Sequence, residues 1–192
     1  MVSRRSKAIQ RTMRKIAVVI CEGESEMSYL NLLKCWYHSP IKVISHVEGT
    51  KISPELVDSR IAEHKISEND KIYSFVMYDM DVPEIKEKLM HCNAEILGSN
   101  PCFEVWLLLH AKEHNQSLRT VATVNELMKS APVWNRYQKS RFTETQKKFL
   151  KNNTEIAISR AKNLEEFKNP SSTIYKLIEL LKNNGYNISN DQ

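Results

Sequence analysis

Two stretches of the sequence decide the fold: Ile16-Ala-Val-Val-Ile-Cys-Glu22-Gly-Glu-Ser-Glu26 and Ile72-Tyr-Ser-Phe-Val-Met-Tyr-Asp79-Met-Asp81. Each is a run of mainly apolar residues that stops abruptly at a carboxylate. A short apolar run bounded by charge predicts a strand that is buried on both faces, as in a parallel sheet.

The first stretch continues as a turn and a helix. Gly23 follows the strand, and apolar residues then recur at helical spacing as far as Tyr37. A strand, a tight turn and a helix form the first half of a βαβ unit. Ligands in open α/β sheets bind outside the carboxyl ends of the strands, so we expect Glu22 and Asp79 to meet at one site.

The following segments repeat this alternation, which predicts an α/β fold: a mostly parallel four-stranded sheet flanked by helices. The later strands are expected over 41–47, 72–78 and 94–97, and the intervening helices over 53–66 and from Pro83 onward. Ser53-Pro54 is typical of a helix start. Further on, the sequence predicts a buried apolar helix over 102–110 and two more helices over 120–129 and 154–167. A basic and aromatic linker is expected over 131–151. A last helix, capped by Asn169-Pro-Ser-Ser-Thr173, is expected to run through Lys182.

Length and composition indicate one globular domain with a helical portion. The 192 residues are 41% hydrophobic and 27% charged. We predict a basic N-terminal leader over 1–14, an α/β core over 15–115 and a helical C-terminal portion over 116–192 packed on the core. No apolar stretch approaches the roughly 20 residues needed to span a bilayer, and no secretory signal is recognisable. The four cysteines lack CxxC spacing, which argues against zinc or disulfides and predicts a cytoplasmic protein.

The net charge of +5 is concentrated in the leader, where no acid occurs among the first fifteen residues. Two interpretations are open: a solvated leader, or an arm that contacts nucleic-acid phosphates. On its own this feature favours the solvated leader, because short basic termini are common.

Glu22, Asp79 and Asp81 are the candidate metal ligands. Mg²⁺ and Mn²⁺ prefer hard oxygen ligands, and Mg²⁺ usually takes one or two carboxylates together with water and phosphate. An Asp-x-Asp at a strand end, joined by a glutamate from the neighbouring strand, would make such an acidic cluster. Alternatively, Asp79 and Asp81 are turn formers before Pro83, with Asp81 capping the next helix.

Other candidates surround these acids. Glu26 joins Glu22, Asp79 and Asp81 as a candidate catalytic residue, or else it serves the helix dipole. Ser99 and Asn100 either bind a phosphate or stabilise a turn. Glu104 lies in an apolar helix, where an unpaired acid is costly, so we expect it to have a metal or basic partner. Together with Lys51, these three are the predicted substrate-binding residues.

These motifs resemble those of the RloB family, a group of Toprim-domain proteins found in prokaryotic defence and restriction-associated loci. The resemblance rests on Glu22-Gly-Glu-Ser-Glu26, Asp79-Met-Asp81, Ser99-Asn-Pro-Cys-Phe-Glu104 with Trp106-Leu-Leu-Leu-His110, and the later Ala161-Lys-Asn-Leu164 with Asn169-Pro-Ser-Ser-Thr173, and it spans about 15–181. It implies a Toprim-like fold in which Glu22, Asp79 and Asp81 are the metal-binding acids. Ser25 stands where relatives often have threonine.

The sequence and the resemblance together predict a Mg²⁺- or Mn²⁺-dependent nuclease of an anti-phage defence system. The expected partners are DNA or RNA and a separate ATPase, because the chain has no P-loop of its own; a homo-oligomer is possible and no membrane is expected. One alternative is a non-catalytic effector or regulatory subunit that binds an ATPase. Another is an enzyme that acts on a small nucleotide.

Overall fold

The computed structural model describes residues 13–65 and 67–184, so the predicted leader lies almost wholly outside the described residues. The strands are β1 (Lys15–Cys21), β2 (Lys42–Val47), β3 (Lys71–Asp79), β4 (Glu95–Asn100) and β5 (Ser171–Ser172). The helices are α1 (Glu24–Tyr37), α2 (Pro54–Ala62), α3 (Pro83–Met90), α4 (Glu104–Ala111), α5 (Thr120–Ser130), α6 (Glu144–Lys162) and α7 (Tyr175–Asn183), with short 3₁₀ turns η1 (Gly49–Lys51) and η2 (Pro132–Trp134).

The strands form one sheet in the order β2-β1-β3-β4-β5. The first four are parallel, which confirms the predicted α/β fold, and β5 pairs with β4 in the antiparallel direction. The prediction of four strands was wrong by one. Ser171 and Ser172, expected within a helix cap, pair with Asn100 and Ser99 instead. A two-residue strand is too short to show an alternating pattern in the sequence.

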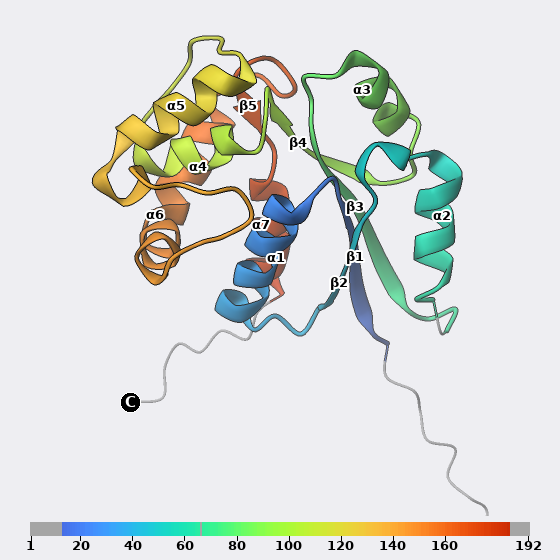
Figure 1. Ribbon diagram of the computed structural model, residues 1–192. Coiled ribbons are helices and arrows are strands. Elements are labelled where there is room, and N and C mark those ends of the chain that lie inside the picture. The colour runs from blue at the N-terminus through green and yellow to red at the C-terminus, as the bar shows by residue number, and fades with distance from the viewer. Residues whose placement is uncertain (1–12, 66, 185–192) are drawn as a thin grey trace, which may run out of the picture.

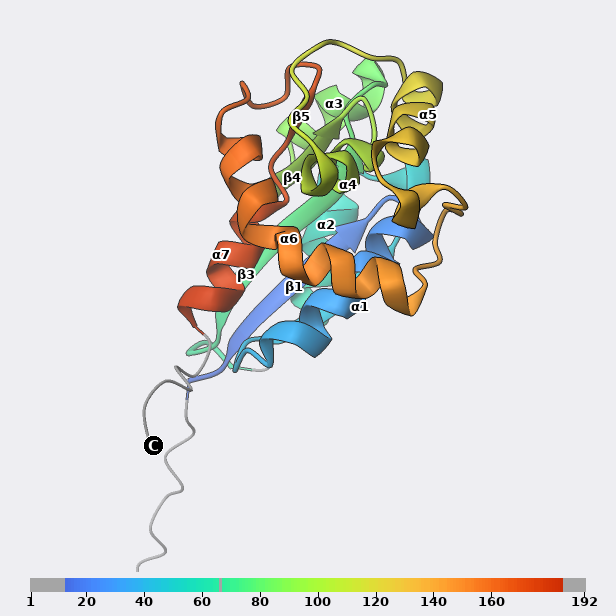
Figure 2. The ribbon, with the colours of Figure 1, turned by 90° about the vertical axis from the view of Figure 1, so that its left-hand side faces the viewer.

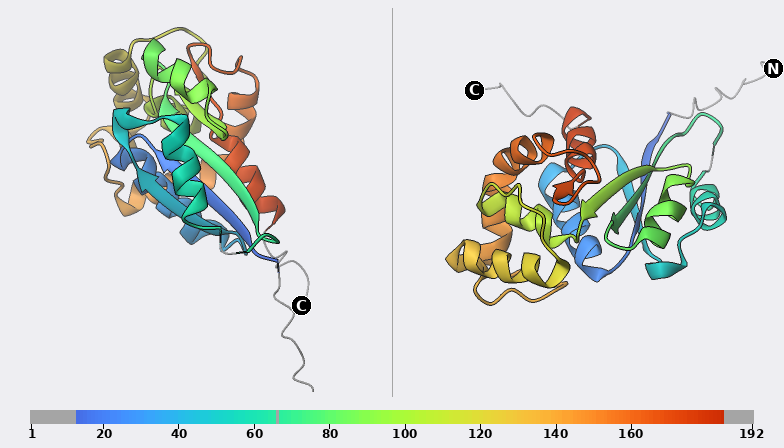
Figure 3. Two further views of the ribbon diagram at one scale, coloured as in Figure 1. Left: turned by 90° about the vertical axis from the view of Figure 1, so that its right-hand side faces the viewer. Right: turned by 90° about the horizontal axis from the view of Figure 1, so that it is seen from above.

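Helices cover both faces of the sheet (Figure 1). α2 and α3 lie on one face, over a small core that contains Ile20, Val76 and Leu89. α1 and α4–α7 lie on the other face, as the view from above in Figure 3 shows. Val19 and Cys21 belong to the larger core on this side, so the side chains of β1 alternate between the two cores.

α4 is the centre of the larger core. Every residue from Glu104 to His110 is buried, as the apolar composition of this segment predicts. α5 and α6 pack against α4, and Figure 2 shows α6 at the outer surface.

The predicted bounds of α6 and α2 were wrong, and α6 ends at Lys162 instead of at residue 167. α6 begins at Glu144, inside the predicted linker, because Thr143 and Gln146 exchange capping hydrogen bonds there. The helix predicted over 53–66 starts as expected, with Ser53 Oγ accepting the Leu56 N–H at 3.2 Å, but it ends at Ala62.

Candidate functional site

Glu22 and Asp79 meet at the carboxyl ends of the neighbouring strands β1 and β3. The Asp79 N–H donates to Glu22 Oε2 at 2.9 Å, and Asp79 Oδ1 accepts the Phe103 N–H at 2.7 Å. Glu22 Oε1 and Asp79 Oδ2 accept no hydrogen bond from the described residues. The backbone therefore orients both carboxylates through one oxygen and leaves the other oxygen for a ligand.

Glu26 adds a third carboxylate from the first turn of α1. It is buried, and its Oε2 accepts the Gly23 N–H at 3.2 Å. This contact confirms that Glu26 caps its own helix. The capping role does not exclude a second role, because the Glu26 charge acts on Asp79.

Glu104 supplies a fourth carboxylate from the start of α4. Its side chain is 1% exposed, Tyr137 Oη donates to Oε1 at 3.1 Å, and Lys139 Nζ lies 3.5 Å from the same oxygen. The expectation of a basic partner is therefore confirmed. Glu104 Oε2 is buried and has no hydrogen-bond partner among the described residues. An unpaired buried carboxylate oxygen is costly, so this oxygen is suited to a bound water or cation.

Burial and neighbouring charges raise the pKa values of three carboxyl groups in the cluster. Burial, with the charges of Glu26, Glu22 and Glu104, raises the pKa of Asp79 to about 9. Burial, with the charges of Glu22 and Glu104, raises the pKa of Glu26 to about 7. Burial also raises the pKa of Glu22. Concentrated negative charge of this kind disfavours ionisation until a cation neutralises it.

Lys139 is the basic residue that reaches this cluster. Burial lowers its pKa, but the charges of Glu104 and Asp79 outweigh that effect and the net pKa is raised. The loop that carries Lys139 is fixed to α1: the Ser140 N–H donates to Ser25 Oγ at 3.1 Å, and Ser28 Oγ donates to the Ser140 carbonyl at 2.8 Å. The sequence predicts only a basic and aromatic linker here and does not single out Lys139, because its partner Glu104 lies 35 positions away in the chain.

Asp81 and Lys51 lie at the edge of the cluster. Asp81 is exposed, and Thr120 Oγ1 donates to its Oδ2 at 2.7 Å. The alternative that Asp81 caps α3 is wrong, because Val82 is the N-cap residue and no side chain caps it. Its charge nevertheless raises the pKa of Glu22. Lys51 is exposed in η1, whose Gly49 N–H donates to the Glu22 carbonyl at 3.1 Å.

The side chains of Ser99 and Asn100 form hydrogen bonds within the protein. Ser99 Oγ lies 3.0 Å from Ser172 Oγ, and Asn100 Nδ2 donates to the Phe167 carbonyl at 2.9 Å. The expected turn at these residues was wrong, because both lie at the end of β4 and pair with β5. Their contacts favour a structural role over phosphate binding. In the basic and aromatic linker, Trp134 and Tyr137 are buried in the larger core, so these rings serve packing.

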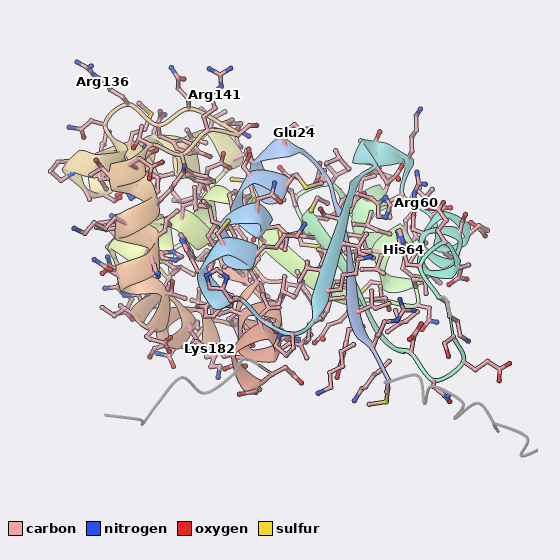
Figure 4. The ribbon with its side chains drawn as sticks, turned by 90° about the horizontal axis from the view of Figure 1, so that it is seen from below. Glu24, Arg60, His64, Arg136, Arg141 and Lys182 are labelled. Atoms are coloured by element: carbon pink, nitrogen blue, oxygen red, sulfur yellow. The ribbon has the colours of Figure 1, made fainter. Side chains whose placement is uncertain are left out.

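Exposed basic side chains lie on the loop that carries Lys139 and in the first half of α6. Arg136 and Arg141 are exposed, and Figure 4 shows both projecting into solvent, away from the body of the protein. Lys148 is also exposed in the first half of α6. This segment therefore presents free cations beside a buried acidic centre.

The donor set fits a hard divalent cation. Among the described residues, only His46, Glu63 and His64 bring three ligand atoms within 4.8 Å of one another, so no three carboxylates of the cluster are close enough to be direct ligands of one ion. Mg²⁺ commonly binds through one or two carboxylates and retains several waters. Glu22 and Asp79 suit direct contact, while Glu26 and Glu104 suit contact through water.

No described helix is both long and apolar enough to cross a membrane.

Comparison with known proteins identifies the family. No curated protein and no solved structure matches the chain at a significant level. A family model described as RloB-like protein matches residues 17–181, which include every carboxylate of the cluster and most of the chain. The chain therefore belongs to the RloB-like protein family.

Proposed function

We propose that this protein is a Mg²⁺- or Mn²⁺-dependent nuclease that cleaves the phosphodiester backbone of DNA or RNA. The observation that carries the proposal is the gathering of four carboxylates, with one buried unpaired oxygen, at the carboxyl edge of a parallel sheet. Such a cluster is costly without a cation. Membership in the RloB-like family supports a role in prokaryotic defence.

Each residue has a part in this proposal. Glu22 and Asp79 would hold the cation, with Asp81 close enough for its charge to act on Glu22. A bound cation would neutralise phosphate charge and lower the pKa of a bound water. Glu26, with a pKa of about 7, is able to exchange a proton near neutral pH.

The basic loop would hold the substrate. Lys139 lies beside Glu104 and Asp79, where a phosphate bound at the carboxylates would meet its ammonium group. Arg136 and Arg141 are exposed on the same loop and would contact neighbouring phosphates without reading sequence. The proposal includes a separate ATPase partner, because the sequence has no P-loop. It also places the protein in the cytoplasm, because the cysteines have no CxxC spacing.

The non-catalytic alternative rests on a specific observation. Glu22, Glu26 and Asp79 each accept a backbone N–H, so all three also have a purely structural use. A subunit that only binds an ATPase would retain these contacts and would not need a cation.

A cleavage assay separates the two functions. Wild type, Glu22→Gln and Glu24→Gln would be incubated with Mg²⁺ or Mn²⁺ and single-stranded DNA, duplex DNA, plasmid, or total RNA that includes tRNA. Glu24 is the matched control, because it is exposed at the start of α1, two residues from Glu22 (Figure 4). We expect Glu22→Gln to lose at least about 100-fold in rate while Glu24→Gln retains the wild-type rate. Equal rates in all three proteins would contradict the proposal.

A further inference from the structure

A second group of metal-ligating side chains lies outside the carboxylate cluster, between β2 and the end of α2. His46 Nε2 and His64 Nε2 are 3.1 Å apart, with ring centroids 5.3 Å apart and an interplanar angle of 33°. The carboxylate of Glu63 completes the group, and all three ligand atoms lie within 4.8 Å of one another.

The fold brings these residues together from two elements. His46 pairs in register with Ile20, whose side chain faces the core under α2, so His46 points to the same face. α2 ends at Ala62, and the N–H groups of Glu63 and His64 still donate to the carbonyls of Ser59 and Ile61. This continued turn keeps His64 beside the sheet, where Figure 4 shows it between α2 and β2.

The separation of the two rings suits one shared ion. With nothing bound, one Nε2 must carry the proton that it donates to the other. A tetrahedral ion with ligand distances of about 2.0–2.1 Å would hold two nitrogen atoms roughly 3.4 Å apart. The rings therefore need to separate by only a few tenths of an ångström and to turn so that both lone pairs point at the same ion.

Arg60 links this group to a second carboxylate. Its Nη1 lies 2.9 Å from Glu63 Oε1, and its Nε donates to Glu48 Oε1 at 2.7 Å. The guanidinium opposes a nearby cation, but the two carboxylates more than balance its charge. Arg60 also holds Glu63 by one oxygen, and such an outer contact orients a ligand toward a metal.

We propose that His46, His64 and Glu63 bind one divalent transition-metal ion of the Zn²⁺ type, with a fourth position open to water. Two imidazoles and one carboxylate select Zn²⁺, Co²⁺ or Ni²⁺ over Mg²⁺, so this site is distinct in chemistry from the carboxylate cluster. Because its ligands come from the edge strand β2 and from the end of α2, a bound ion ties these elements together.

Cobalt binding to the full chain tests this site, with Co²⁺ as a spectroscopic probe. The variants are His46→Gln and His64→Gln, and the control is His91→Gln, an exposed histidine that follows α3. Wild type should bind one Co²⁺ at this site, reported by visible bands typical of low coordination and by no thiolate charge-transfer band, and Zn²⁺ should displace it. Both site variants should bind at least about tenfold more weakly, because even outer contacts of metal-bound histidines change affinity by 10–100-fold.

Two further readouts keep the test decisive. Zn²⁺ at about 100 times its Kd should raise the Tm of wild type by roughly 5–10 °C, and it should not raise the Tm of His46→Gln by a comparable amount. Glu22→Gln should bind Co²⁺ as wild type does. Equal Co²⁺ affinity in wild type, His46→Gln and His64→Gln would overturn the proposal, as would a loss of binding confined to Glu22→Gln.

Discussion

Replacing Asp79 by asparagine should stabilise the folded protein, and the gain should grow with pH. The pKa of Asp79 is raised from 3.8 to about 9, first by burial and then by the charges of Glu26, Glu22 and Glu104. Between those two pH values the folded chain holds a proton that the unfolded chain releases. Stability from this group is therefore fully present at low pH and is lost as pH rises toward 9. The amide of Asp79→Asn would not titrate, and its oxygen can still accept the Phe103 N–H.

The size of the expected change in unfolding free energy follows from the pKa shift of Asp79. Between pH 5 and pH 8 each pH unit is worth about 1.36 kcal/mol, which gives a limit of about 4 kcal/mol over the three units. Asp79 is only partly buried, so solvent screens part of the free-energy cost of ionising it in the folded protein. We expect wild type to lose about 2 kcal/mol relative to Asp79→Asn over this range.

Urea unfolding in the presence of a chelator, at pH 5 and pH 8, measures this difference. Asp81→Asn is the matched control, because it removes an exposed carboxylate two residues away and should follow the pH dependence of wild type. If wild type and Asp79→Asn showed the same pH dependence, Asp79 would not be held protonated by its neighbours, and the electrostatic description of the cluster would fail.

Four other substitutions give three separate tests. Lys139→Met should slow cleavage at least about tenfold in the nuclease assay, and an unchanged rate would exclude Lys139 from substrate binding. The Tm should change little, because an ion pair with an exposed lysine contributes about 1 kcal/mol or less to stability. Ser99→Ala and Ser172→Ala, combined in a double-mutant cycle by urea unfolding, should show a coupling energy of about 1 kcal/mol. A coupling near zero would refute this bond. Trp134→Ala should lower the free energy of unfolding by about 3–5 kcal/mol, and a loss below about 1 kcal/mol would contradict its place in the core.

The sequence was sufficient to predict the parallel sheet because its central strands β1 and β3 are mainly apolar runs bounded by charge. The meeting of Glu22 and Asp79 at one edge of the sheet could also be predicted, since the carboxyl ends of neighbouring parallel strands lie at the same edge. The burial of α4 followed from its apolar composition.

Other features depend on contacts that leave no local pattern. β5 is a pair of serines whose partners, Ser99 and Asn100, lie more than 70 positions earlier. Lys139 reaches Glu104 because Ser25 and Ser28 hold its loop, and no spacing rule links those residues. The group formed by His46 and His64 was not predicted either, since single histidines on a strand and after a helix carry no ligand spacing.

The most direct test of the central claim is a calorimetric Mn²⁺ titration of Glu22→Gln and Glu24→Gln, both carrying His46→Gln so that only the carboxylate cluster is measured. We predict that one Mn²⁺ binds per chain in the Glu24→Gln protein, and that Glu22→Gln binds it at least about tenfold more weakly because a direct ligand is lost. Equal binding by the two proteins, or no binding by either, would contradict a metal site at Glu22 and Asp79 and would favour the non-catalytic subunit.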